Sequence, residues 1–491
     1  MQTVGLSAAA SALAGCQTKP KAVGDRPNVL FILTDDQRAD CLGCAGHPHL
    51  KTPHLDRLAA EGAHFTNTFV TTSLCSPSRA SFLSGLYAHT HGVSNNFTDY
   101  PSAMTSWPMR LQQEGYETAY IGKWHMGEKS DAKRPGFDYW VSHSGQGDYV
   151  DTEFNVNGTR KVLKGYYTHA VTDEAIAWLT QPHEKPWCLI LGHKAAHTPF
   201  TPEPKYEHLF DDVEVPYPDS AFHLDDKPEW IKERIDTWHG IYGPIYGFRK
   251  DFPDTSPESV KEFARFVRSY WATIKSVDDS VGRLCEALKQ AGQLDNTLIV
   301  FAGDNGMFLG EHGMTDKRSM HEESIRVPLV VRYPPLAKPG TTVTEQVLNI
   351  DLAPSVLDIC GARPLERVHG MSWKPLLEGT SDGWRTAWYY EYNYEKQFPY
   401  TPNVRGVRTE KWKYMEYPPG APDARTYKAE LYDIQTDPKE LKNLIDDPQH
   451  QDVVAHLKQE LVRLKQETGA VPDTMPVYEG IKKELPEESI R

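Results

Sequence analysis

Short apolar runs in this chain repeatedly end in polar, chemically capable side chains, and this pattern limits the folds open to it. The first run, at 28–33, leads directly into Thr34-Asp35-Asp36. Runs at 116–121, 187–191 and 298–302 are followed by Gly122-Lys123-Trp124-His125, by His193 and His197, and by Asp304-Asn305. Apolar runs of this length are typical of strands buried in a parallel sheet. Because open α/β sheets bind ligands outside the carboxyl ends of their strands, we expect a site there.

The rest of the first 375 residues fits a large α/β domain. A fifth apolar run, at 329–332, follows Arg326. Residues 258–291 place apolar side chains three and four positions apart, and Gly292 follows as a helix cap would. The stretch 200–257, rich in Pro, Asp and aromatic residues, is predicted to be an insertion near the active-site face. We therefore predict an α/β domain over 26–375, with a large, mixed, mostly parallel sheet sandwiched by helices.

The pattern changes after about residue 375. Segments 404–409 and 411–417 read as two strands joined by a short turn, 430–433 continues as a strand, and 453–468 is an amphipathic helix. We therefore predict a smaller C-terminal α+β subdomain over 376–491, with an antiparallel sheet and a helix. A chain of 491 residues is long enough for two such units.

Residues 1–25 read as a targeting segment and a linker. Residues 3–15 are small and apolar, and Leu13-Ala14-Gly15-Cys16 resembles a bacterial lipobox. An ordinary secretory segment with an unrelated cysteine is the alternative, and no basic residue precedes it. The run is too short to span a membrane. The prediction is an exported protein that is periplasmic or lipid-anchored through Cys16 at the cell envelope.

The charge balance argues against one class of partner. The chain has 53 basic and 67 acidic residues, a net charge of −14. An acidic chain lacks the basic surface that nucleic-acid binding needs, so we expect no nucleic-acid partner. An anionic substrate would have to be attracted by a local group of basic side chains.

The most specific local signal is Cys75-Ser76-Pro77-Ser78-Arg79. Pro77 suits the first position of a helix, which places Cys75 at a helix N-terminus, where anions are favoured. The seven cysteines are too scattered to form a disulfide framework. Taken alone, this setting predicts a reactive thiolate, and a free cysteine before a helix is also common.

Continued through Leu83 and Gly85, this segment resembles the signature of type I sulfatases of the alkaline phosphatase superfamily. The resemblance extends from about residue 26 to 445. Its further matches are Asp35-Asp36, Gly122-Lys123-Trp124-His125, His197-Thr198-Pro199, Gly303-Asp304-Asn305-Gly306, Gly310-Glu311-His312-Gly313 and Lys317. Membership would make the chain an enzyme that hydrolyses sulfate esters.

The resemblance implies two cofactors. In that family the cysteine at position 75 is converted to Cα-formylglycine, so the chain would need a formylglycine-generating or anaerobic sulfatase-maturing enzyme as a partner. The implied metal ligands are Asp35, Asp36, Asp304, Asn305 and the modified Cys75. Such oxygen donors suit Ca²⁺, with Mg²⁺ as the alternative. A cation would also offset the repulsion between the adjacent carboxylates of Asp35 and Asp36.

The resemblance also implies catalytic roles. A hydroxyl of hydrated formylglycine would attack sulfur, and the second hydroxyl would then help to expel sulfate. Arg79 would hold the nucleophile and the metal carboxylates, while Lys123 and Lys317 would bind sulfate oxygens. His125 would act as a base, and His197 would protonate the leaving oxygen, with Lys317 as the competing donor.

Four further residues are candidates for substrate binding. Arg318 and His321 follow Lys317 closely, and His312 lies in a matching motif. His193 shares the strand-end position of His197. The structural alternatives are a loop-stabilising hydrogen bond for His312 and an ordinary buried histidine for His193.

The C-terminal aromatic segments bear on the substrate. Tyr390-Glu391-Tyr392, 398–402 and 405–409 resemble N-acetylglucosamine-6-sulfatases and mucin- or heparan-desulfating relatives. We therefore favour a sulfated saccharide, in particular 6-O-sulfated N-acetylglucosamine of a glycosaminoglycan or mucin. The alternatives are an algal polysaccharide sulfate, phosphonate monoester or phosphodiester hydrolysis on the same fold, and a non-catalytic binding protein.

Overall fold

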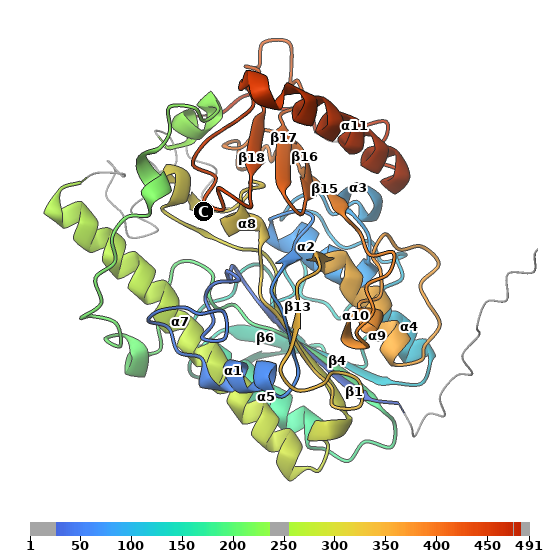
Figure 1. Cartoon of the computed structure of the whole chain (residues 1–491). Coiled ribbons are helices and arrows are strands. Elements are labelled where there is room, and N and C mark those ends of the chain that lie inside the picture. Colours follow the sequence, from blue (N-terminus) through green and yellow to red (C-terminus); the bar gives the residue numbers. More distant parts are fainter. Residues whose placement is uncertain (1–25, 236–254, 475, 483–491) are drawn as a thin grey trace, which may run out of the picture.

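The computed structural model describes residues 26–235, 255–474 and 476–482. Figure 1 shows a large sheet flanked by helices, with a smaller sheet and helix α11 packed at one end. The large sheet contains, in order across it, β13 (Thr341–Val343), β2 (Ala63–Phe65), β12 (Leu329–Arg332), β9 (Thr297–Gly303), β1 (Asn28–Thr34), β8 (Trp187–Gly192), β4 (Glu117–Gly122), β5 (Tyr139–Ser142), β6 (Glu153–Val156) and β7 (Thr159–Val162). We call it the central sheet.

The middle of the central sheet is parallel, as predicted. Strand β1 runs parallel to β8 and β9, and β4 runs parallel to β8 and β5. Strands β12, β6 and β7 add antiparallel pairings toward the edges, so the sheet is mixed. The register pairs Thr34 with Gly303, Leu33 with Gly192 and Gly122 with Gly192. The four strands β9, β1, β8 and β4 therefore end side by side.

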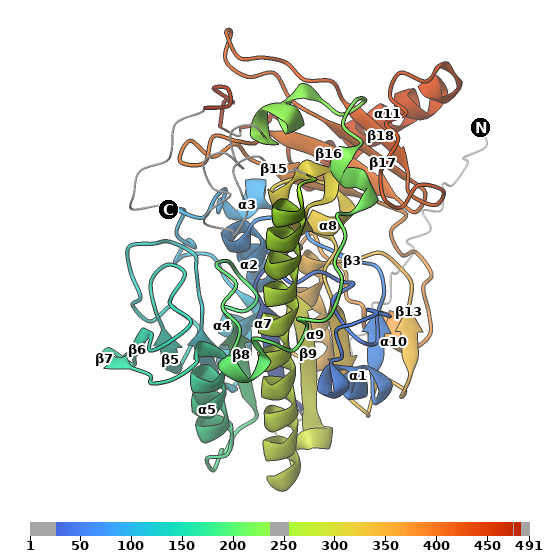
Figure 2. The ribbon, with the colours of Figure 1, turned by 90° about the vertical axis from the view of Figure 1, so that its left-hand side faces the viewer.

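Helices cover both faces of the central sheet, because its buried strands need apolar cover on each side. Leu30 and Ile32 of β1 share one core with α1 (Pro53–Ala60), α5 (Tyr167–Leu179) and α7 (Pro257–Gln290). These three helices lie on the side that faces the viewer in Figure 2. Phe31 points to the other core, which contains residues of α2 (Cys75–Ser84), α4 (Trp107–Gln113) and α9 (Leu352–Ile359).

The long helix α7 follows from its sequence. Its apolar side chains repeat every three or four residues, and most of them are buried. Ser256 caps the N-terminus by accepting a hydrogen bond from the backbone N–H of Ser259, at 3.3 Å. Gly292, just past the C-terminus, has a φ of 68°, a conformation that glycine adopts without strain. The prediction of a helix over 258–291 differs from the observed bounds by one residue at each end.

The C-terminal sheet contains four antiparallel strands, β15 (Ala387–Tyr392), β16 (Val404–Thr409), β17 (Trp412–Glu416) and β18 (Glu430–Asp433). Helix α11 (Gln451–Thr468) buries Val454, Leu457 and Leu461 against it. The same core contains Phe69, Val70 and Leu74, which directly precede α2. The predicted antiparallel sheet with a helix is confirmed, and it packs against the segment that leads to Cys75.

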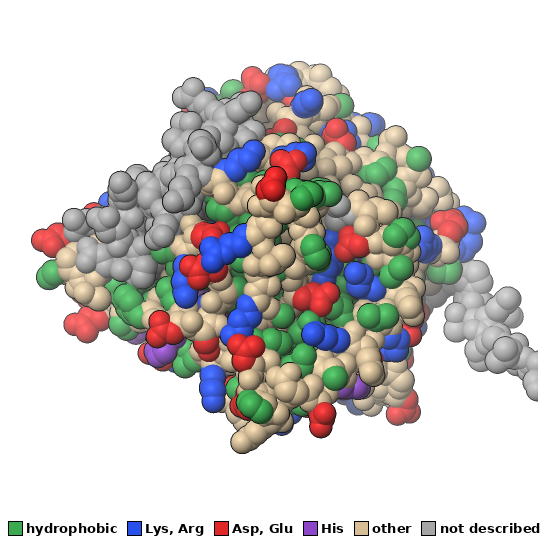
Figure 3. Space-filling model, turned by 90° about the horizontal axis from the view of Figure 1, so that it is seen from above, with side chains coloured by type: hydrophobic (Ala, Val, Ile, Leu, Met, Phe, Trp, Pro, Cys, Tyr) green, Lys and Arg blue, Asp and Glu red, His purple; other side chains and the backbone are tan. Residues whose placement is uncertain are grey.

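Several predictions fall partly or wholly outside the described residues. The targeting segment with Cys16 and residues 236–254 of the predicted insertion lie there. The six described cysteines are all free. None of the described helices has the length and apolar character needed to cross a membrane. Seen from above, acidic and basic side chains are interspersed (Figure 3).

Candidate active site

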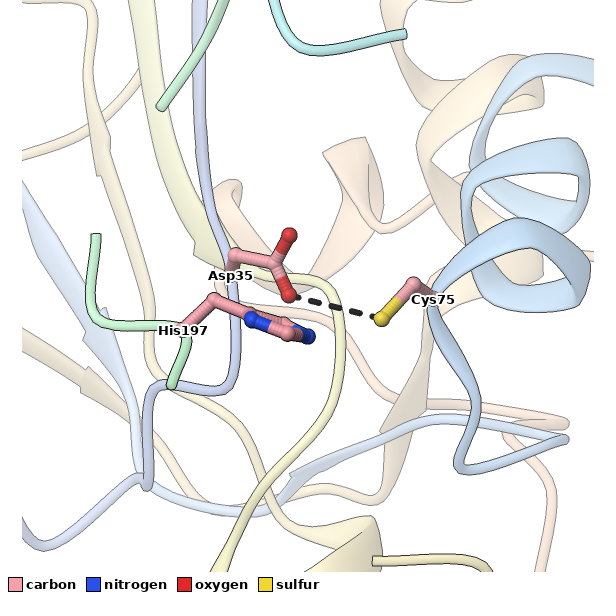
Figure 4. A group of neighbouring side chains, drawn as sticks. All are labelled: Asp35, Cys75 and His197. Atoms are coloured by element: carbon pink, nitrogen blue, oxygen red, sulfur yellow. Dashed lines mark hydrogen bonds between the residues drawn. The ribbon is translucent and has the colours of Figure 1, made fainter. Parts of the chain in front are cut away.

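The predicted strand-end residues converge on the first residue of α2. Asp35 and Asp36 follow β1, Asp304 follows β9, and each is almost completely buried. One carboxylate oxygen of each of these residues and the Sγ of Cys75 all lie within 4.8 Å of one another. In Figure 4, the side chains of Asp35 and His197 approach Cys75 from the strand side. We call this group, with its basic partners below, the catalytic cluster.

Cys75 is the first residue of α2. The sequence predicts that Pro77 is the first helical residue, so the helix starts two positions earlier than expected. The thiol of Cys75 donates a hydrogen bond to Oδ1 of Asp35 at 3.4 Å, and Nζ of Lys317 donates to its Sγ at 3.0 Å. Burial raises the pKa of this thiol well above its ordinary value. This direction argues against the simple reactive thiolate that the helix N-terminus alone predicts.

Arg79, one helical turn after Cys75, links Asp35, which follows β1, to Asp304, which follows β9. Its Nε donates to Oδ2 of Asp304 at 2.8 Å, and its Nη2 donates to Oδ2 of Asp35 at 3.2 Å. Its Nη1 donates to the carbonyl oxygen of Lys123 at 2.7 Å. All these groups are buried, so the guanidinium fixes the acidic side chains relative to α2.

Two lysines complete the charge balance of the cluster. Nζ of Lys123 donates to Asp35, and Nζ of Lys317 donates to Asp36. Three carboxylates thus face three cations. Burial would raise the pKa of Asp35, but Lys123 and other nearby cations outweigh it and hold that pKa well below its ordinary value. Burial dominates at Asp36 and raises its pKa to about 7.

Asn305 indicates that the acidic group can hold a cation. Its Nδ2 donates to Oδ1 of Asp36 at 2.6 Å and to the carbonyl oxygen of Gly306 at 2.8 Å. Its Oδ1 is buried and has no hydrogen-bond partner among the described residues. A buried oxygen of this kind normally has a donor or an ion beside it. Carboxylate and amide oxygens are the ligands that Ca²⁺ and Mg²⁺ prefer, so the residues fit a hard divalent cation.

His197 lies at the edge of the acidic group. Its Nε2 is 3.8 Å from Oδ2 of Asp36, and its Nδ1 is 2.6 Å from the carbonyl oxygen of Thr198. Because a carbonyl only accepts, Nδ1 carries a proton. Burial and the charge of Lys123 lower the pKa of His197. Its side chain is 15% exposed, whereas that of Asp36 is 2% exposed, so His197 lies toward the open side of the cluster.

His125 lies on the other side, beyond Lys123. Its Nε2 is 3.0 Å from Oε1 of Glu128 and 3.1 Å from Nε2 of Gln146. Gln146 also accepts a hydrogen bond from Nζ of Lys123. Burial lowers the pKa of His125, which favours the neutral ring that a base needs.

The four predicted substrate-binding residues lie in three different places. Arg318 adjoins Lys317; its Nε donates to Oε2 of Glu395 at 2.7 Å, and its guanidinium lies 5.0 Å from the ring centre of Phe398. The rings of His312 and His321 lie 4.3 Å apart, between α8 (Glu322–Ile325) and the C-terminal sheet.

His193 occupies the third place. Its Nε2 lies 3.3 Å from Oγ of Ser280, in the middle of α7. Its side-chain contact is therefore with the helix layer and not with the catalytic cluster. This placement agrees with the alternative of an ordinary buried histidine.

Sequence reasoning missed several residues that shape this site. Gln146 and Glu128 connect Lys123 with His125, and neither belongs to a recognisable motif. The hydroxyl of Tyr390, from β15, lies 2.6 Å from Oγ of Ser73, two residues before Cys75. The contact between Tyr390 and Ser73 depends on how the C-terminal sheet packs against the segment before Cys75, which the sequence does not indicate.

Comparisons with known proteins identify the family of the chain. The sulfatase family model matches residues 27–362, and a model described as the C-terminal part of N-sulphoglucosamine sulphohydrolase matches residues 310–467. An N-acetylglucosamine-6-O-sulfatase of Bacteroides thetaiotaomicron is 33% identical over 95% of this chain and 90% of its own length. An ulvan-active sulfatase of Formosa agariphila is 28% identical over 93% of this chain and 85% of its own length.

A solved structure is also similar to this chain in fold. It is described as a complex with its substrate D-glucosamine-2-N,6-O-disulfate, and it superposes with a TM-score of 0.82 at 32% identity, covering 91% of this chain and 99% of that one. Fold and sequence thus agree over nearly the whole chain. The chain belongs to the sulfatase family of the alkaline phosphatase superfamily and is an enzyme of that family.

Proposed function

We propose that this enzyme removes sulfate from a carbohydrate, with 6-O-sulfated N-acetylglucosamine of a glycosaminoglycan or mucin as the favoured substrate. The observation that carries the proposal is the convergence of three acidic and three basic side chains on Cys75 at the ends of parallel strands. The similarity to a glucosamine-6-O-sulfatase supports the choice of sugar.

Two groups would complete the site. Asp35, Asp36, Asp304 and Asn305 would hold Ca²⁺, or Mg²⁺, which supplies polarisation of the sulfate oxygens. Formylglycine formed from Cys75 by a formylglycine-generating or anaerobic sulfatase-maturing enzyme would supply the hydroxyl nucleophile. The Sγ of Cys75 marks the position of its oxygens, beside Asp35 and Lys317.

The basic residues would bind and orient the sulfate group. Lys317 donates to both Asp36 and Sγ of Cys75, so its ammonium lies where a sulfate oxygen must approach the nucleophile. Lys123 donates to Asp35, on the other side of the acidic group. Arg79 donates to Asp35 and Asp304 and keeps the acidic side chains in place. Buried, fixed cations of this kind stabilise the negative charge that grows on the sulfate oxygens.

Two histidines would handle protons. His197 would donate a proton from Nε2 to the leaving sugar oxygen, since its Nδ1 is bound to the carbonyl of Thr198. An anionic sulfate ester beside the ring raises its pKa and favours the doubly protonated form that this role needs. His125, next to Gln146 and Glu128, would accept a proton when sulfate leaves the nucleophile.

The sugar would extend from the cluster toward the C-terminal sheet. Arg318 follows Lys317 and is held between Asp316, at 2.9 Å, and Glu395, at 2.7 Å. Charged groups fixed in this way suit sugar hydroxyls and further anionic substituents. Export, with Cys16 as a lipid anchor, would place the enzyme where extracellular polysaccharides are degraded.

A panel of sulfated sugars tests the proposed function. Purified enzyme should release sulfate from 6-sulfated N-acetylglucosamine at least tenfold faster than from ulvan or galactan oligosaccharides, measured as kcat/KM from sulfate released. Preference for the algal oligosaccharides would overturn the sugar assignment. Preference for a phosphonate monoester or phosphate diester over every sulfate ester would overturn the reaction class.

Mass spectrometry of the tryptic peptide that spans residue 75 tests the nucleophile. After expression with a maturing enzyme, we expect the thiol to be replaced by an aldehyde and its hydrate. An unmodified Cys75 in fully active enzyme would refute the proposed nucleophile, whatever the substrate.

A further inference from the structure

We propose that His312, Glu323 and Glu440 form a second divalent-cation site, structural in role and suited to Zn²⁺, between the central sheet and the C-terminal sheet. One ligand atom of each residue lies within 4.8 Å of the other two. His312 lies in the turn η5 (Glu311–Gly313), Glu323 lies in α8, and Glu440 lies in the loop after β18. In Figures 1 and 2, α8 lies against the end of the C-terminal sheet that carries β18.

The side chain of His312 is the first independent sign of a ligand. It is completely buried, yet neither Nδ1 nor Nε2 has a hydrogen-bond partner among the described residues. A neutral imidazole has one donor and one acceptor, so burying both without partners costs free energy. A metal ion bound to one ring nitrogen would satisfy that nitrogen.

The distance between His312 and Glu323 is the second sign. Nε2 of His312 lies 3.6 Å from Oε2 of Glu323, which is too long for a good hydrogen bond. Two ligands of a tetrahedral zinc ion, each at about 2.1 Å from the metal, lie about 3.4 Å apart. The two side chains are therefore spaced as ligands of one ion.

The charges around the site compensate Glu323 less directly than its two neighbours. Glu322 pairs with Arg408 at 3.0 Å and with Lys413 at 2.8 Å, and Glu440 pairs with Lys413 at 2.8 Å. The ion-pair contact of Glu323 within 4.0 Å among the described residues is with His312, whose pKa is lowered by burial. Burial also raises the pKa of Glu323, and the more distant Arg38 offsets this effect only in part. A divalent ion would place a positive charge in direct contact with Glu323.

An ion could reach this site from solvent. Glu323 lines two surface cavities of about 490 and 500 Å³, one of them shared with Arg326 and the other with Ser220. The donor set also differs from that of the catalytic cluster. Nitrogen with carboxylate oxygens suits Zn²⁺, whereas the oxygen donors of Asp35, Asp36, Asp304 and Asn305 suit Ca²⁺.

The position of the site gives it a role. Lys317, which contacts Cys75, lies in the segment between His312 and Glu323. A cation held by these two residues and by Glu440 would fix both ends of that segment to the loop that follows the C-terminal sheet. The site would thus position Lys317 indirectly while touching no substrate.

Two other histidine–carboxylate groups must be separated from this site in any experiment. They are His54 with Asp278 and Asp279, and His169 with Glu203 and Asp279. Lys205 already bonds to Asp279 at 2.7 Å and lies 3.2 Å from Glu203. Because both groups contain Asp279, the single variant Asp279→Asn disables them together.

The test uses the full-length, calcium-loaded enzyme after removal of transition metals. Titration with ZnCl₂ by calorimetry should show one saturable site in the wild type and in Asp279→Asn. At a hundredfold excess over Kd, Tm should rise by about 3 °C. Titration with CoCl₂ should give the visible absorption bands of tetrahedral Co²⁺.

The decisive variant is Glu323→Gln, which keeps the shape of the side chain. It should bind Zn²⁺ at least tenfold more weakly and lose the Co²⁺ bands and the Tm shift. The matched control is Glu430→Gln, a buried carboxylate that accepts hydrogen bonds from Tyr417 and Tyr432 and lies outside the trio. It should retain all three signals.

Three results would overturn the proposal. They are wild-type enzyme without stoichiometric Zn²⁺ binding, Glu323→Gln enzyme that binds as tightly as wild type, and binding that disappears in Asp279→Asn. Since the readouts are metal binding, Tm and absorption, none of them depends on whether the enzyme acts on the proposed sugar.

Discussion

Two buried groups of charged residues in this molecule look alike and differ in what they can do. The catalytic cluster surrounds Cys75. The second group, which we call the junction network, comprises Lys227, His312, His321, Glu322, Glu323, Arg408, Lys413, Glu430 and Glu440. Both contain several carboxylates, lysines and histidines that are almost fully buried.

Their difference lies in where the side chains originate and what they surround. The residues of the catalytic cluster come mainly from loops that follow parallel strands, and they meet at one small sulfur atom at a helix N-terminus. In the junction network, Arg408, Lys413 and Glu430 belong to the C-terminal sheet itself, and their partners are one another and tyrosine hydroxyls. Buried charge alone therefore does not indicate catalysis; convergence on a reactive atom does.

The largest effect should come from Cys75→Ala. Because the nucleophile is lost, sulfate release should fall by about 10⁵-fold or more. The free energy of unfolding should change by less than about 2 kcal/mol, measured by urea denaturation. The matched control is Cys188→Ala, another fully buried cysteine, in β8, which should keep its activity. Substantial turnover by Cys75→Ala would show that the residues around Cys75 are no more important for catalysis than those of the junction network.

The opposite behaviour is expected for the junction network. Lys413→Met should destabilise the protein by about 3–5 kcal/mol, because it leaves Glu322 and Glu440 buried without this cation. The folded enzyme should keep kcat within about threefold of wild type, since its cluster residues are unchanged. Lys411→Met is the control, because this half-exposed lysine 3.4 Å from Asp433 should contribute less than about 1 kcal/mol. Urea denaturation and sulfate release measure the two quantities.

Within the catalytic cluster, His197→Gln separates proton transfer from binding. We expect kcat to fall by about 10²–10³-fold for a sugar sulfate, whose alcohol needs protonation to leave. For an aryl sulfate with an acidic phenol, the loss should be less than about tenfold, since that group leaves as an anion. Equal losses on both substrates would assign the proton to Lys317 and leave His197 with a positioning role.

The smallest effect concerns a second contact of the C-terminal sheet. Nδ1 of His89, in α3 (Ala88–His91), lies 2.9 Å from Oε1 of Glu391 in β15. Burial opposes the charged ring, but Glu391 outweighs it and raises the pKa of His89. Burial likewise opposes the Glu391 carboxylate, but the same contact lowers its pKa.

The sign of the pH dependence follows from these directions. The charged ring of His89 stabilises the folded state to its full extent below the unfolded pKa of about 6.5. This stabilisation is lost as pH rises through the higher pKa of the folded state. The Glu391 carboxylate stabilises the folded state above about pH 4.3, and this stabilisation is lost as pH falls through its lowered pKa in the folded state. The Tm difference between wild type and His89→Gln should therefore be largest near about pH 6 and smaller at about pH 9. An unchanged difference would show that the contact is not charged.

The catalytic cluster was easier to predict than the junction network, for a physical reason. Asp35, Asp36, Asp304 and Asn305 directly follow strands that end side by side, so their proximity follows from strand order along one edge. His193 has the same position in sequence, but its side chain contacts α7. The period of a strand does not determine where a side chain in the following loop points.

The parts that could not be predicted depend on contacts between distant segments. Glu440 pairs with Lys413, and Glu395 with Arg318, only because the C-terminal sheet packs beside the loop that carries Lys317. Gln146 meets Lys123 and His125 from a loop without regular periodicity. Sequence patterns predict the elements and their order, whereas such contacts depend on how the elements dock.

Under the proposed function, the complete burial of Cys75 would set an order of events during biosynthesis. In the folded chain this residue has no exposed surface, and Tyr390 of the C-terminal sheet bonds to Ser73 just before it. The proposed maturing enzyme would therefore have to reach Cys75 before the newly made chain has folded. Under the proposed function, a chain that folds first is trapped as an inactive protein, and a maturing enzyme added later cannot rescue it. Conversion of Cys75 would then have to precede folding.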